Sequence, residues 1–179
     1  MDFKKEYRIK LVSKEFLNSD TCYLGFECPD IANTAVPGQF VNISAGTVFL
    51  KRPFGIASTD KEKGIFYIGV KVVGKGTSEI SQFEPGHMVD CLGPLGKGFD
   101  FDGFDTVILT GGGTGVFPIN FAYETLTSLG KNVIVCEGFR NASQVILNKP
   151  SYILTTDCGD CGIKGTVIAG LDTIDISDP

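Results

Sequence analysis

VILTGGGTGVFP, residues 107–118, predicts a short apolar strand, a glycine turn and the start of a helix. An aliphatic run of this length is typical of a parallel strand covered on both faces. The glycines allow positive φ and close approach to the backbone, and Pro118 suits the first turn of a helix. A helix N-terminus that follows a strand attracts phosphate, although a tight turn without a ligand has the same pattern.

The residues after this turn alternate between helical and strand patterns. A helical period runs over 116–129 and Gly130 is expected to end it. Strands are expected at 106–110, 132–136 and 151–155, with a short helix over 142–147. This β-α-β-α-β order predicts a parallel sheet of three strands with right-handed crossovers.

The first hundred residues show the two-residue alternation of antiparallel strands, broken by turns. The expected strands are 7–12, 22–28, 39–44, 65–73 and 88–92, and the expected turns are Pro29-Asp30, Pro37-Gly38, 60–64 and 84–86. This spacing predicts a barrel or a sandwich. We place the boundary at 98–105, which gives an N-terminal domain of residues 1–100 and a short α/β domain of residues 101–179.

Charge and composition exclude some classes of function. The chain has 179 residues, a formal net charge of -5 and scattered basic residues, so nucleic acid is not expected as a partner. No apolar run reaches the roughly 18 residues of a membrane helix, and the charged start lacks the apolar core of a secretion signal. We therefore expect a cytoplasmic protein with reduced cysteines, which lie at positions 22, 28, 91, 136, 158 and 161.

Three upstream segments carry candidate binding residues. Arg52-Pro53-Phe54 joins a guanidinium fork, which can hold a phosphate, to a ring that can lie on a flat ligand, although a surface arginine before an edge strand fits as well. In Val73-Gly74-Lys75-Gly76-Thr77-Ser78, Thr77 or Ser78 can cap a short helix through Phe83, and a capped hairpin without a ligand is the alternative. The third segment, 91–99, fits a plain linker. The single histidine, His87, is expected in a surface turn.

Taken in order, these segments resemble the ferredoxin-NADP reductase superfamily and, within it, the electron-transfer subunits of dihydroorotate dehydrogenase. The resemblance covers about residues 5–170 and rests on Pro37-Gly38-Gln39-Phe40, Arg52-Pro53-Phe54, 73–77, 92–96, 111–116 and Gly138-Phe139-Arg140. It implies a flavin-binding barrel followed by a nicotinamide-nucleotide domain. It also implies FAD as cofactor, NAD(P)H as electron donor, a catalytic dehydrogenase subunit or another redox protein as partner, and a role in pyrimidine biosynthesis.

The resemblance assigns roles to individual residues. Arg52 would bind the FAD pyrophosphate, with Pro53 beside it and Phe54 against the flavin. Gly74, Gly76 and Thr77 would contribute backbone N–H groups and a hydroxyl to the phosphates. Ile68, Val70 and Lys71 would line the isoalloxazine. The turn formed by Gly111, Gly112, Gly113, Thr114 and Gly115 would face the NAD pyrophosphate and nicotinamide.

The sequence departs from the family in two places. Gly55 stands where the family usually has a serine or threonine whose hydroxyl reaches the flavin. The family also continues into four cysteines that hold a [2Fe-2S] centre, which is not expected in this chain. The pair Cys158-Gly159-Asp160-Cys161 is compatible with a redox disulfide, half of a metal site or a coincidence. Three hypotheses follow: a shortened electron-transfer flavoprotein, a non-catalytic binding module, and a truncated product of a longer gene.

Overall fold

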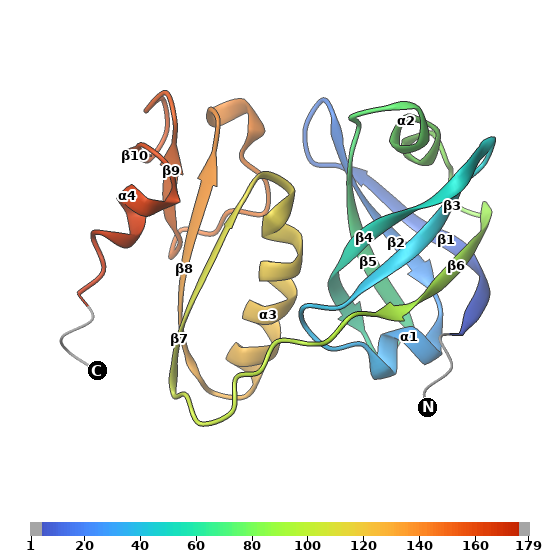
Figure 1. Ribbon diagram of the computed structural model, residues 1–179, viewed down its shortest axis with the longest axis horizontal. Coiled ribbons are helices and arrows are strands. Elements are labelled where there is room, and N and C mark those ends of the chain that lie inside the picture. Colours follow the sequence, from blue (N-terminus) through green and yellow to red (C-terminus); the bar gives the residue numbers. More distant parts are fainter. Residues whose placement is uncertain (1–4, 176–179) are drawn as a thin grey trace. The chain divides into compact units, whose positions relative to one another are not determined.

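We describe residues 5–175 in a computed structural model of the chain. The first four residues of the charged start and the last four of the C-terminal tail lie outside the described residues. The chain divides into two compact units, Met1–Phe99 and Asp100–Pro179 (Figure 1). Each unit has its own buried core.

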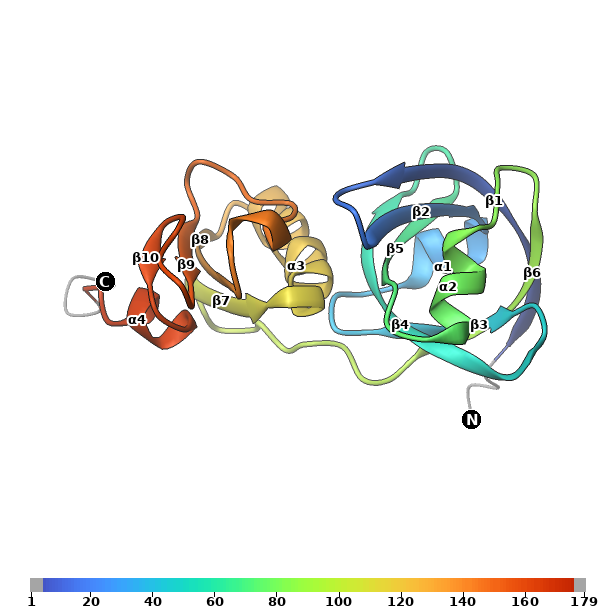
Figure 2. The ribbon, with the colours of Figure 1, turned by 90° about the horizontal axis from the view of Figure 1, so that it is seen from above.

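The first unit is a closed antiparallel barrel with the strand order β1-β2-β5-β4-β3-β6 (Figure 2). The strands are β1 (Glu6–Phe16), β2 (Thr21–Glu27), β3 (Phe40–Ala45), β4 (Val48–Asp60), β5 (Ile65–Lys71) and β6 (Met88–Leu95). β1 closes the barrel because it pairs with both β2 and β6. Alternate residues of the strands fill the interior, among them Leu24, Phe26, Ile56, Phe66 and Ile68, all with no exposed surface. The predicted antiparallel barrel is confirmed.

Two short helices cover the two ends of this barrel (Figure 1). The expected turn at Pro29-Asp30 is instead the first turn of α1 (Pro29–Thr34), because a proline at the first helical position needs no N–H partner there. The second helix, α2 (Lys75–Ser81), begins two residues before Thr77. Its N-cap residue is Gly74, so the predicted caps Thr77 and Ser78 are wrong.

The second unit is a parallel sheet in the order β10-β9-β8-β7, with α3 and α4 on opposite faces (Figure 1). Its elements are β7 (Thr106–Gly112), the 3-10 turn η1 (Gly113–Gly115), α3 (Val116–Ser128), β8 (Asn132–Phe139), the 3-10 turn η2 (Ala142–Gln144), β9 (Ile153–Thr156), β10 (Ile163–Lys164) and α4 (Val167–Leu171). The predicted fold class is confirmed, and β10 adds one strand to the three expected. The helix expected over 142–147 is wrong beyond residue 144, where η2 ends. Val145 has an extended backbone and Leu147 has a φ of 55°, and neither conformation continues a helix.

β7 is an edge strand of the described sheet, and the expectation that both of its faces are covered is wrong. Leu109 packs with residues of α3 in the core of this unit. The opposite face of β7, with Thr106, Ile108 and Thr110, stays exposed, because α4 lies mainly over β8 and β9. Among the residues described, no helix has the length and apolar character needed to cross a bilayer.

Candidate cofactor sites

The first candidate site lies where β4 meets the start of α2. Arg52, two residues before Phe54 on β4, is half-buried and reaches Gly76: a Cβ on Gly76 would lie 2.7 Å from the Arg52 Nε. Any side chain at position 76 would therefore displace the guanidinium. The Arg52 Nη1 donates to the Leu50 carbonyl at 2.8 Å, which fixes the orientation of a group with five N–H donors.

The loop before α2 is closed by Thr77. The Thr77 hydroxyl accepts hydrogen bonds from the backbone N–H groups of Val73 and Gly74, at 2.9 and 3.1 Å, and donates to the Gly74 carbonyl at 3.0 Å. This hydroxyl shapes the loop from within rather than pointing outward. The backbone N–H groups of the first helical turn, which have no partner inside a helix, are the donors that this loop can offer to a phosphate.

Glu79 attaches α2 to the hairpin between β3 and β4. Its carboxylate accepts a hydrogen bond from the Thr47 N–H at 2.9 Å and another from the Thr47 hydroxyl. These hydrogen bonds lower the pKa of Glu79, with smaller contributions from Lys75 and Arg52. The anchor holds Gly76 beside the arginine, so the two phosphate-binding candidates are positioned together.

The other residues expected at the flavin lie at different depths. Phe54 is 9% exposed, and Ile68 and Val70 have no exposed surface. The last two side chains fill the barrel, so only their backbone can touch a ligand outside it. Pro53 is exposed, and the Lys71 ammonium lies 3.6 Å from the Asp20 carboxylate.

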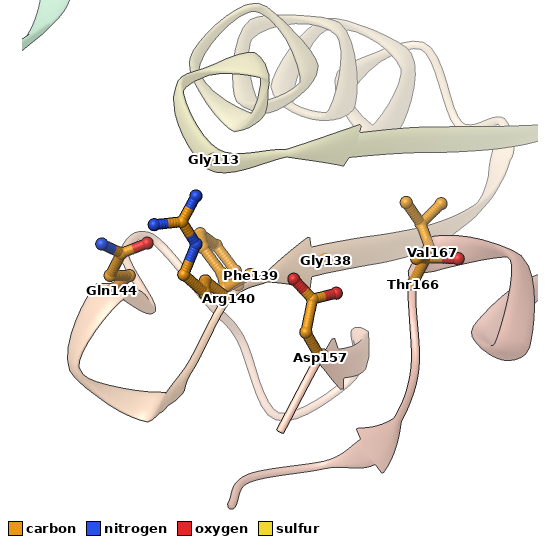
Figure 3. Close-up of a pocket in the computed structure, with 8 residues that line it drawn as sticks. All are labelled: Gly113, Gly138, Phe139, Arg140, Gln144, Asp157, Thr166 and Val167. Carbon is orange, nitrogen blue, oxygen red and sulfur yellow. The ribbon is translucent and has the colours of Figure 1, made fainter. Parts of the chain in front are cut away.

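The second candidate site is a pocket of about 260 Å³ at the carboxyl ends of β7, β8 and β9, lined by Gly113, Gly138, Phe139, Arg140, Gln144, Asp157, Thr166 and Val167. Figure 3 shows the Arg140 guanidinium pointing towards the Gly113 loop, with the Asp157 carboxylate on the same side of the pocket. This edge is where open α/β sheets bind ligands.

Of the predicted glycine turn, only Gly113 lines this pocket. Gly111 has a packing role, since a Cβ there would lie 2.9 Å from the Ile119 Cγ1 and 3.0 Å from the Gly115 carbonyl oxygen. Gly113 adopts a φ of 54°, which favours glycine. The lining residues Gln144, Asp157, Thr166 and Val167 were not predicted, and Gly138, Phe139 and Arg140 entered only through the family motif. The strand-end rule for parallel sheets is the one signal that points to their loops.

Two polar groups of the second unit are buried without a hydrogen-bond partner in the described part of the chain. Within residues 5–175, the Glu137 Oε2 and the Tyr152 hydroxyl have no hydrogen-bond partner, and Glu137 is 1% exposed. Burial raises the pKa of Glu137 to about 7, against a smaller lowering effect of Lys149. The Lys149 ammonium lies over the rings of Tyr123 and Tyr152, at 4.1 and 5.6 Å.

Residues 8–99 match the model of a protein family described as the oxidoreductase FAD-binding domain. The match covers just over half of the chain and nearly all of the barrel. The chain belongs to this family. The barrel is therefore an FAD-binding domain, and Arg52 and Gly76 lie within the matched residues.

Curated relatives extend the similarity into the second unit. The chain is 34% identical over 173 residues to the electron transfer subunit of dihydroorotate dehydrogenase B (NAD(+)) from Desulforamulus reducens, covering 91% of this chain and 66% of the relative. It is 31% identical to the homologue of that subunit from Thermotoga maritima, covering 92% of this chain and 61% of the relative. The chain thus spans less than two thirds of the length of these relatives.

Solved structures agree with this assignment. The NADH-dependent reduced ferredoxin-NADP oxidoreductase superposes with a TM-score of 0.83 at 30% identity, covering 93% of this chain and 62% of that one. The ferredoxin reductase of carbazole 1,9a-dioxygenase has a TM-score of 0.84 at 16% identity, covering 97% of this chain and 58% of that one, which shows the shared fold. The predicted resemblance to the ferredoxin-NADP reductase superfamily is confirmed.

Proposed function

We propose that this chain is an FAD-dependent electron-transfer flavoprotein that passes electrons between NAD(P)H and a partner redox protein, such as a dihydroorotate-oxidising subunit in pyrimidine biosynthesis. The observation that carries the proposal is the contact between Arg52 and Gly76 inside the matched FAD-binding residues. We place the protein in the cytoplasm, in keeping with six free thiols.

The residues at the barrel site fit a diphosphate. The donors are a guanidinium and backbone N–H groups, and a side chain at position 76 would displace that guanidinium. In this proposal Arg52 binds the FAD pyrophosphate, Gly74 and Gly76 bring backbone N–H groups to it, and Thr77 keeps that loop closed. Pro53, Phe54 and Lys71, with the backbone of Ile68 and Val70, border the ring system. FAD supplies the conversion between two-electron and one-electron transfer.

The second unit would hold the nicotinamide nucleotide in the pocket beside Gly113. Arg140 offers a planar cation to a phosphate, and Asp157 offers a carboxylate to a ribose hydroxyl. Gly111, Gly112, Thr114 and Gly115 would support this loop at the end of β7. Arg140 favours a ribose that carries a phosphate and Asp157 favours a free ribose hydroxyl, so NADH and NADPH have to be compared as donors.

The substitution Arg52→Ala tests the flavin site. Loss of a hydrogen bond to a charged group costs about 1.5–3 kcal/mol, so we expect FAD affinity to fall about 10- to 100-fold, as measured by flavin fluorescence on titration. Arg52→Lys keeps the charge without the fork and should fall between Arg52→Ala and the native protein. The matched control is Arg8→Ala, an exposed barrel arginine paired with Asp90 at 2.8 Å. Equal FAD affinity in all four proteins would contradict the assignment.

Anaerobic absorbance spectra test the electron donor. We expect the flavin band of the loaded protein to bleach on addition of NADH or NADPH, and the faster donor identifies the nucleotide. Bound flavin that neither nucleotide reduces would leave the FAD site standing and remove the proposed activity.

A second candidate function, a non-catalytic flavin-binding module, is favoured by Gly55. This residue pairs with Phe40 on the neighbouring strand and brings no hydroxyl to the barrel surface. If the missing hydroxyl is what makes the protein a module, Gly55→Ser should give flavin reduction where the native protein has none. Rapid reduction of the native protein would dispose of this candidate.

A further inference from the structure

Two cysteines lie on the loop that joins β9 to β10. Cys158 is exposed and Cys161 is half-buried, and both carry free thiols. The other four cysteines, at positions 22, 28, 91 and 136, are buried. Cys158 and Cys161 are therefore the thiols that a reagent in solution reaches first.

The backbone brings both cysteines close to Thr156. The Gly159 N–H donates to the Thr156 carbonyl at 3.1 Å, and Gly159 has a φ of 73°, so the chain turns back directly after Cys158. The Thr156 hydroxyl donates to the Cys161 carbonyl at 2.7 Å and accepts from the Cys161 N–H at 3.3 Å. The turn over 156–159 and the return of Cys161 to the Thr156 hydroxyl hold residues 158 and 161 in one compact loop, and a disulfide between them requires a Cα separation of about 4.4–6.8 Å.

The same loop holds one wall of the pocket. The Cys158 thiol donates to the Arg140 carbonyl at 3.3 Å. The Asp160 carboxylate, which lies between the two cysteines in sequence, accepts the Ala142 N–H at 3.0 Å. Arg140 and Asp157 both line the pocket, so a rearrangement of residues 158–161 acts on two of its lining residues.

We propose that Cys158 and Cys161 form a reversible disulfide whose formation releases the Cys158–Arg140 contact at the pocket wall. A low-molecular-weight disulfide is the oxidant. The Cys158 thiolate attacks it, forms a mixed disulfide and expels one small thiol. The Cys161 thiolate then attacks the Cys158 Sγ and expels the second small thiol, so two electrons pass to the oxidant and the two thiol protons leave with the small thiols.

Alkylation and mass spectrometry of the full chain test the disulfide, with glutathione disulfide as oxidant. In the reduced native protein we expect a thiol reagent to label Cys158 and Cys161 ahead of the four buried cysteines, which act as internal controls. After oxidation neither should be labelled, and the peptide that carries both should be lighter by two hydrogens. Dithiothreitol should restore the labelling.

The variant Cys161→Ser separates the two chemical steps. In this variant the reaction should stop at a glutathione adduct on Cys158, since the thiol of residue 161 is absent. Three results would overturn the proposal: a stable adduct on Cys158 in the native protein, continued labelling of both thiols after oxidation, or protection that depends on Zn²⁺ without a loss of two hydrogens.

Hydrogen exchange tests the consequence for the pocket without any nucleotide, so its outcome is independent of the proposed function. The Cys158 N–H donates a hydrogen bond to the Arg140 carbonyl at 3.4 Å, and the Ala142 N–H donates one to the Asp160 carboxylate. We expect both amides to exchange several-fold faster in the oxidised protein than in the reduced one, with no change in the peptides of the barrel. Equal exchange at both amides would overturn the link between the disulfide and the pocket wall.

Discussion

Glu137 illustrates how a single buried residue sets the pH response of the second unit. Its carboxyl lies in the interior, where one oxygen has no partner among the described residues, and a buried carboxylate without a partner is costly. The neutral acid is favoured there, so the pKa of Glu137 rises from 4.5 to about 7. Neither the strand pattern around this residue nor its place beside Gly138 predicted that burial.

The consequence is a loss of stability as the pH rises. Below about pH 4.5 both states of the protein are protonated at Glu137. Between pH 4.5 and 7 the Glu137 carboxyl ionises in the unfolded chain but keeps its proton in the folded one, so the free energy of unfolding falls as the pH rises. Above pH 7 the carboxyl is ionised in both states, and the free energy of unfolding no longer changes with pH because of this group. Near pH 8 we expect the free energy of unfolding of Glu137→Gln to exceed that of the native protein by up to about 3 kcal/mol, so the variant should unfold at a higher urea concentration. Near pH 4.5 this difference should disappear.

Circular dichroism during urea unfolding at the two pH values measures this difference. The control is Asp102→Asn, which changes an exposed carboxyl of the same unit. If Glu137→Gln and the native protein show the same pH dependence, the carboxyl is not the source of the effect.

At the scale of elements, the connection from β7 to α3 combines two requirements for glycine. Gly111 has no room for a side chain against Ile119, whereas a Cβ on Gly115 would meet no atom within 4 Å, and Gly115 has a φ of -66°. The two positions look alike in the sequence and differ in the fold. The strand and helix close on each other at Gly111 because α3 packs back over β7.

The pair Gly111→Ala and Gly115→Ala therefore makes a matched experiment. Overpacking costs about 1–3 kcal/mol, so Gly111→Ala should lower the thermal unfolding midpoint by several degrees. Gly115→Ala should leave the midpoint unchanged or raise it slightly, because alanine restricts the unfolded chain at a compatible position by about 0.4–1 kcal/mol. Differential scanning calorimetry measures both, and the reverse ranking would contradict the packing of this turn.

At the scale of the whole molecule, the matched FAD-binding residues fall within one of the two compact units. A ligand stabilises the state that binds it by about 2.7 kcal/mol at one hundred times its dissociation constant. With saturating FAD, we expect the free energy of opening measured by hydrogen exchange to rise by up to this amount in the barrel strands β1 to β6. The rise in β7 to β10 should be much smaller. The control is Arg52→Ala at the same FAD concentration, and equal protection in both units would show that they open together.

The local patterns were sufficient for the class of the fold and for most of its elements, although they missed the strand β4, the helix α1 and the strand β10. The two-residue alternation marked the inward residues of the barrel, such as Leu24 and Phe26, because each strand hides one face from water. The switch to β-α-β order predicted the parallel sheet. Turn details failed where side chains compete for the same backbone groups, as at Thr77, which lies in the first turn of α2 and accepts the Gly74 N–H instead of serving as the N-cap residue.

Contacts between distant segments required the folded chain. Arg52 meets Gly76 only because β4 and α2 come together at one end of a barrel that β1 closes by pairing on both edges. Arg140 and Asp157 share a pocket because β8 and β9 end at the same sheet edge. A periodic pattern reports which side of a strand or helix is buried, whereas register and crossover geometry decide which of those sides face one another, and short-range residue order carries little of that information.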